Sequence, residues 1–210
     1  MDYCGDLTVT RNTFIDCAAS GMMLGTGCNN ISVSGIGVKY NGPYTVKNNY
    51  VSHSNRTADD AAGVYIVGFA GKGSIISDNF VDMTGSIADD NPAYYLDEGS
   101  EYVTVTHNMS INTEHWLWCR ALPLKFNGSK YVGGDKLEKN TIMNCAVYGN
   151  FADRRDRGAD YAPGYRWPSA AEVKGSNVTV EEAKIVPDWQ NDPEIMTIYE
   201  NAGCTWMSKE

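Results

Sequence analysis

The sequence lacks long apolar runs, basic runs and any spacing typical of a metal site. No apolar stretch approaches the roughly 18 residues of a membrane-spanning helix, so we expect no membrane insertion. With 17 basic residues against 26 acidic ones, the formal net charge is −9, which argues against a nucleic-acid partner. The three histidines have no zinc-ligand spacing, and the six cysteines form no CxxC motif. We therefore expect no metal centre of the zinc type.

What the sequence does contain is a segment that recurs around an asparagine. The five anchors are Asn12, Asn49, Asn79, Asn108 and Asn140, at steps of 37, 30, 29 and 32 residues. Three residues before each anchor stands an apolar residue: Val9, Val46, Ile76, Val105 and Leu137. One residue before it stands a polar residue: Arg11, Asn48, Asp78, His107 and Lys139. Five residues after it stands a small one: Cys17, Ser54, Thr84, Thr113 and Cys145. Such columns indicate strands that stack in register along the chain.

These columns, with their asparagine ladder, resemble the right-handed parallel β-helix of the pectate-lyase-like superfamily. The resemblance implies an all-β, single-stranded helix of about five coils over residues 1–150. Stacked coils would lie about 4.8 Å apart and share one continuous core. Residues 151–210 read as a C-terminal extension with an irregular segment. It contains a short helix near 193–202, which Asp192 would cap, Pro193 would begin and Gly203 would stop.

A second block follows the anchors, and it predicts a ridge on one side of the stack. Its four copies are "GMMLGTG" (21–27), "GVYIVGF" (63–69), "AYYLDEG" (93–99) and "LPLKFNG" (122–128). The later three begin 14 residues after the asparagine, but the first begins only 9 residues after it. Three adjacent coils would therefore carry longer turns. Two of these turns hold an Ala-Asp-Asp pair, Asp59–Asp60 and Asp89–Asp90, and stacking would bring the four carboxylates together. Turn chemistry, a ligand site and a structural Ca²⁺ site all remain open for them.

The third turn, "EHWLWCR", adds aromatic and basic residues to this ridge. It would place Trp116, Trp118 and Arg120 beside the acids. Aromatic faces beside carboxylates suit sugars, whose C–H faces lie on rings while their hydroxyls need acceptors. The alternative for the two tryptophans is that at least one of them covers the core.

Asp97 is the leading candidate for a catalytic residue. Alternation along "AYYLDEG" turns Tyr94 and Leu96 inward, so Tyr95 and Asp97 point outward. Tyr65 would lie on the same face one coil earlier, and Lys125 of "LPLKFNG" one coil later. The resemblance also favours Asp97, Asp89 and Asp90, because members of this superfamily commonly use carboxylates on adjacent coils.

We therefore predict a carbohydrate-active enzyme, with a glycoside hydrolase favoured. Its catalytic residues would be Asp97 and the Asp89/Asp90 pair. The sugar would contact Tyr65, Tyr95, Trp116, Trp118, Arg120, Lys125, Asp59 and Asp60. A Ca²⁺-dependent polysaccharide lyase, with Lys125 or Arg120 as base, and a non-catalytic glycan-binding or adhesin-type helix are the alternatives. No cofactor is expected, with Ca²⁺ left open for the lyase.

Two further expectations concern the surroundings of the chain. A polymer substrate implies a secreted or periplasmic protein, although "MDYCGDLTVT" has no signal-peptide pattern. Leu7, Val9, Phe14 and Leu24 of the first coil have nothing before them to cover them. Because repeat stacks need a cap at each end, we expect upstream residues or another chain to cover this coil.

Overall fold

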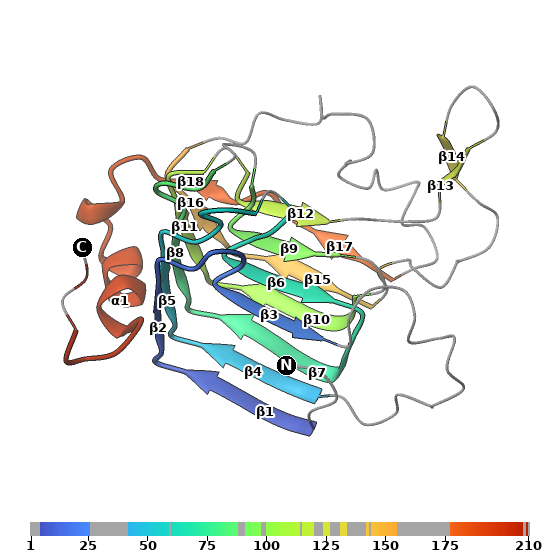
Figure 1. Ribbon diagram of the computed structural model, residues 1–210, viewed down its shortest axis with the longest axis horizontal. Helices are drawn as coiled ribbons and strands as arrows, with labels where there is room; N and C mark the ends of the chain where they lie inside the picture. Colours follow the sequence, from blue (N-terminus) through green and yellow to red (C-terminus); the bar gives the residue numbers. More distant parts are fainter. Residues whose placement is uncertain are drawn as a thin grey trace.

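In the residues that the structure describes, the chain forms a β-rich fold with three parallel sheets and one short α-helix (Figure 1). This computed structural model describes residues 5–25, 42–58, 60–87, 91–97, 100–113, 115–119, 124–126, 131–133, 142, 144–154, 177–207 and 209. The predicted all-β class is confirmed.

Each parallel sheet collects strands that recur along the chain. The first sheet holds β1 (Gly5–Thr10), β4 (Gly42–Lys47), β7 (Phe69–Ser77), β10 (Glu101–Thr106), β15 (Ala146–Tyr148) and β17 (Thr179–Val180). The second holds β2 (Thr13–Ile15), β5 (Tyr50–Ser52), β8 (Phe80–Asp82), β11 (Met109–Ile111), β16 (Phe151–Ala152) and β18 (Lys184–Ile185). The third holds β3 (Met22–Gly25), β6 (Val64–Val67), β9 (Tyr94–Leu96) and β12 (Leu117–Cys119). The chain visits the sheets in this order, and we call one such passage a layer. The sheets continue beyond residue 150, through β17 and β18.

The predicted inward column of apolar residues is confirmed for four layers. Val9 pairs with Val46, Val46 with Ile76, and Ile76 with Val105, and all four side chains are buried in the main core. In the fifth layer Val105 pairs with Val147 of β15. The prediction of Leu137 for this place is therefore wrong, and Leu137 itself lies outside the described residues.

In the asparagine ladder, too, the fifth residue differs from the predicted one. From the second layer on, the side-chain oxygen of the ladder asparagine accepts hydrogen bonds from the backbone and side-chain N–H groups of the asparagine one layer earlier, at 2.9–3.1 Å. The series runs Asn12, Asn49, Asn79, Asn108 and then Asn150, 42 residues further on, in place of the predicted Asn140. Cys145 therefore precedes its anchor and does not share a column with Cys17. Neither cysteine forms a disulfide bond.

The C-terminal segment covers the outer face of the second sheet. A 3₁₀ turn, η1 (Trp189–Asn191), leads into α1 (Pro193–Asn201). The Asp192 side chain caps α1 by accepting from the N–H groups of Glu194 and Ile195, as predicted. Ile195 and Ile198 are buried against the outward side chains of the second sheet, among them Tyr50 and Phe80. In the described part of the chain, no helix has the length and apolarity needed to cross a membrane.

The first layer is covered more fully than the sequence indicates. Val9 and Leu24 are buried, and Leu7 and Phe14 are partly buried against the main core. The expectation that upstream residues or another chain cover this layer stays a prediction. Among the described strands, β1 pairs only with β4, so this side of the first sheet ends at β1.

Candidate functional site

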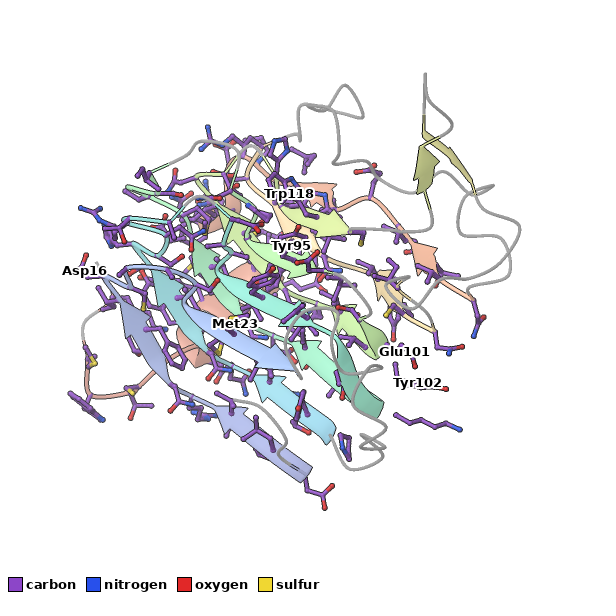
Figure 2. All side chains as sticks on the ribbon, turned by 45° about the vertical axis from the view of Figure 1, so that its right-hand side comes forward. Asp16, Met23, Tyr95, Glu101, Tyr102 and Trp118 are labelled. Carbon is purple, nitrogen blue, oxygen red and sulfur yellow. The ribbon has the colours of Figure 1, made fainter. Side chains whose placement is uncertain are left out.

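An aromatic row runs along the outward face of the third sheet. The strand register aligns Met23, Tyr65, Tyr95 and Trp118, one residue from each of the four layers. Figure 2 shows Met23, Tyr95 and Trp118 following one another across β3, β9 and β12. Tyr65 and Tyr95 belong to a small apolar cluster, separate from the main core, against which Trp118 packs. The predicted outward direction of the two tyrosines is thus confirmed.

The rings of this row pack against one another. Tyr65 and Tyr95 stack with their centroids 4.8 Å apart and their planes 13° apart. Trp118 meets Tyr95 edge to face, at 5.3 Å and 88°. Tyr65 is 5% exposed and Tyr95 is 1% exposed, whereas Trp118 is half-buried. The expected open platform of tyrosine faces is therefore absent from this row, and Trp118 is its more accessible aromatic ring.

Asp97 lies beside this row, immediately after β9. Its carboxylate is buried, at 1% exposure, and accepts a hydrogen bond on Oδ2 from the hydroxyl of Tyr65. Its own backbone N–H donates to the carbonyl of Ile66 at 2.8 Å. Contacts to the neighbouring layer therefore fix both the backbone and the side chain of Asp97. The predicted pairing of Asp97 with Tyr65 is confirmed.

Lys125 does not continue this row. β12 occupies the fourth place in the third sheet, and it pairs Trp118 with Tyr95. Lys125 instead pairs with Val132 in an antiparallel hairpin of β13 (Leu124–Phe126) and β14 (Tyr131–Gly133), which lies apart from the three sheets in Figure 1. The prediction of "LPLKFNG" as the fourth block, with Lys125 one layer after Asp97, is wrong. The reason is that the longer turn is present after Asn49 and Asn79 but not after Asn108.

The two tryptophans have different roles in the structure. Trp116 is 2% exposed and belongs to the main core, next to Leu117. This burial agrees with the alternative that one of the tryptophans covers the core, and a contact of Trp116 with a ligand stays a prediction. Trp118 points to the opposite side of β12, where the ring of the buried His115 lies 5.8 Å from it.

Most of the repeated acidic pairs lie outside the described residues. This is true of Asp59, Asp89 and Asp90, and also of Arg120. Asp60 is exposed. The residues that flank the pairs lie on neighbouring layers and are joined by hydrogen bonds. Before the pairs, the N–H of Ile87 donates to the carbonyl of Asn55 at 2.9 Å. After the pairs, the N–H of Gly63 donates to the carbonyl of Pro92 at 3.2 Å. The turns that carry the two pairs thus start and end side by side, as the stacking prediction requires.

Sequence reasoning missed one carboxyl group close to Asp97 in the chain. The backbone N–H of Ser100 donates to the carbonyl of Asp97 at 2.9 Å, and Glu101 follows Ser100 at the start of β10. Burial raises the pKa of Glu101 above its ordinary value. The signal was present in "LDEGSE", where Glu101 stands four residues after Asp97.

A second missed group of polar residues holds the turns that follow the second sheet. Asn112 donates from its side chain to Asp82 at 2.8 Å and from its backbone to Asp153 at 3.0 Å. Burial raises the pKa of Asp153 despite the hydrogen bond from Asn112 and the neighbouring Arg154. These contacts join three successive layers, so we assign them to the scaffold. Among the described residues, no three histidine, cysteine, aspartate or glutamate side chains gather as metal ligands would.

Comparison of the chain with protein-family models, with curated proteins and with solved structures found no match.

Proposed function

We propose that the three parallel sheets are the faces of a single-stranded, right-handed parallel β-helix of the pectate-lyase-like type, and that the protein is a glycoside hydrolase. The repeated strand order, the shared inward column and the asparagine ladder support the helix. Adjacent layers of such a helix place side chains of the same face about 4.8 Å apart. Polymeric carbohydrate lies largely outside the cytoplasm, so we propose a secreted or periplasmic protein.

The observation that carries the enzymatic proposal is the buried carboxylate of Asp97 on an outward face. An outward strand position offers no reason to bury a charged group, because burial of a carboxylate carries a free-energy cost. Here the carboxylate is 1% exposed and is oriented by Tyr65, whose ring is in turn held by Tyr95. Such support is typical of a side chain whose position matters for chemistry.

Glycoside hydrolysis needs two carboxyl groups in different protonation states. One protonates the glycosidic oxygen, and the other acts as base or nucleophile. Asp97 accepts a hydrogen bond from Tyr65, and this acceptor role suits the base or nucleophile. The acid would come from Asp89 or Asp90, as the repeated turns indicate, or from Glu101, whose pKa is raised by burial.

The test is hydrolysis of a panel of polysaccharides and aryl glycosides by the wild-type protein and by Asp97→Asn. We expect the variant to lose activity by about 10³-fold, the size typical of removing an acid–base or nucleophilic group. Asp16→Asn is the matched control, since Asp16 is exposed in a bend of the first layer and should leave activity unchanged. Thermal unfolding of each variant separates loss of chemistry from loss of fold.

The same panel distinguishes the alternatives. Chelator-sensitive release of unsaturated sugars would indicate a polysaccharide lyase. Binding without turnover by the wild-type protein would indicate a glycan-binding helix. Full activity in Asp97→Asn would remove Asp97 from the mechanism.

A further inference from the structure

A histidine connects the C-terminal helix to the stack of layers. His107 occupies the bend between β10 and β11, and its Nδ1 lies 2.6 Å from Oδ1 of Asp78, which occupies the same bend one layer earlier. Its Nε2 lies 3.3 Å from Oε1 of Glu194, the second residue of α1. Both nitrogens of one ring thus face carboxylate oxygens.

The hydrogen-bonding capacity of the three groups determines the state of the ring. An ionised carboxylate can only accept hydrogen bonds, so each ring nitrogen must donate. A neutral imidazole carries one N–H, and its other nitrogen would direct a lone pair at a carboxylate. Only the imidazolium ion satisfies both contacts.

We propose that His107 is a pH-dependent clasp, which holds α1 against the second sheet when the ring is protonated and releases its contact with Glu194 when the proton leaves. The Asp78 contact is the shorter one, so the neutral ring keeps its single N–H toward Asp78. The contact with Glu194 is then lost. This proposal does not depend on the proposed enzymatic function.

What the clasp controls is access to an apolar surface. α1 buries Ile195 and Ile198 against outward side chains of the second sheet, and Tyr199 packs its ring edge-on to Phe80 and Tyr50. This packing keeps the helix bound at every pH. Loss of the clasp therefore increases the frequency of brief openings and does not unfold the helix permanently.

Other charged side chains lie around the contact between His107 and Glu194. Lys47 lies 3.2 Å from Asp78, and Lys184 lies 3.5 Å from Asp192 at the helix cap. The ring of Phe151 packs edge-on against the imidazole at 5.7 Å. Carboxylates and lysines keep their charges between pH 5 and pH 8, whereas an ordinary imidazole changes its charge in this range.

The experiment is amide hydrogen exchange of the full chain at pH 5 and pH 8, expressed as protection factors so that the intrinsic pH dependence of exchange cancels. We expect the amides of α1 to be about two- to fivefold better protected at pH 5, the size of one exposed ionic contact. His107→Asn, which is neutral at both pH values and tolerates the left-handed bend, should remove this difference. Glu194→Gln should remove it as well, because a glutamine can accept from the imidazolium and donate to the neutral ring.

His53→Asn is the matched control. His53 has the same left-handed backbone at another bend, and its ring nitrogen Nδ1 lies 3.3 Å from the hydroxyl of Ser52. The pH dependence of α1 should survive this substitution. Equal protection of α1 at pH 5 and pH 8 in the wild-type protein would overturn the proposal, and so would a pH dependence that persists in His107→Asn.

Discussion

At the scale of the residue, the backbone conformation explains why a polar residue precedes the asparagines of the ladder. The residue before each ladder asparagine has a positive φ: 55° at Arg11, 54° at Asn48, 55° at Asp78, 52° at His107 and 61° at Gly149. This left-handed conformation is open to glycine and is tolerated by asparagine, aspartate and histidine more readily than by most residues. The column is therefore polar because the chain must bend there, and Gly149 fits the fifth bend better than the predicted Lys139.

One of these bend residues gives a prediction for the pH dependence of stability. Burial raises the pKa of Asp78, but hydrogen bonds from Ser77, His107 and Lys47 outweigh burial, so its pKa lies below the ordinary value in the folded protein. The charged contacts of Asp78 therefore stabilise the fold at pH values above about 4, the pKa of an aspartate in the unfolded chain. This contribution is lost as the pH falls through the lower pKa that Asp78 has in the folded protein. Asp78→Asn should reduce the free energy of unfolding by about 0.5–1 kcal/mol at pH 5.

The measurement is urea unfolding of the wild type and Asp78→Asn between pH 5 and pH 2. The difference between them should shrink below pH 4. Asparagine already occupies this bend at Asn48, so backbone strain does not enter the comparison. A difference that stays constant down to pH 2 would show that the charge of Asp78 contributes nothing.

At the scale of the element, the sequence predicts strands well where the repeat is regular. Four inward residues and four ladder asparagines are found where the columns place them, because alternation along a strand and register between strands are both local rules. The prediction fails after Asn108, where the hairpin of β13 and β14 falls between β12 and β15. "LPLKFNG" and Asn140 mimic the repeat by composition, whereas "LWC" and Asn150 occupy its places.

The candidate site, too, could be predicted from the sequence only in part. The outward direction of Tyr65 and Asp97 follows from alternation, and stacking of the layers places them together. Their burial and the stacking of Tyr65 on Tyr95 depend on side chains packed across layers, which alternation does not determine. Trp116 lies immediately before β12, where the alternation of a strand no longer applies, so its position in the core did not follow from the sequence pattern.

The register of β10 can be tested with two adjacent substitutions. Val105 is fully buried and points into the core, whereas its neighbour Thr104 is partly exposed on the outward face. Val105→Asp should destabilise the protein by more than about 4 kcal/mol, or unfold it, because an unpaired charge would enter the core. Thr104→Asp should change stability by less than about 1 kcal/mol. Circular dichroism and urea unfolding measure both, and similar losses in the two variants would contradict the register.

At the scale of the whole molecule, the C-terminal segment returns to the beginning of the chain. After α1, the N–H of Gly203 donates to the carbonyl of Asn48 at 2.8 Å. The N–H of Cys204 then donates to the hydroxyl of Thr13 at 2.8 Å. One segment thus contacts β2 in the first layer, while α1 packs against side chains of later layers such as Phe80. We infer that this segment joins layers that otherwise contact only their neighbours, and so makes unfolding of the stack more cooperative.

Gly203 is the point at which this connection can be broken with one methyl group. Its φ is +79°, and an added Cβ would lie 2.6 Å from Oγ1 of Thr13 and 2.8 Å from Cβ of Tyr50. Gly203→Ala should therefore combine backbone strain with a steric clash and reduce the free energy of unfolding by about 2–3 kcal/mol.

Gly73→Ala is the control, since Gly73 has a similar φ of +92° but its added Cβ would have only Pro43 nearby, at 3.9 Å. It should cost about 1 kcal/mol, from backbone strain alone. Urea unfolding gives both free energies, and limited proteolysis reports whether the segment after α1 has left the second sheet. If the two variants were equally stable and equally resistant to cleavage, the contact of Gly203 with the first layer would not contribute to stability, and the cooperativity of the stack would have to come from the ladder and the core alone.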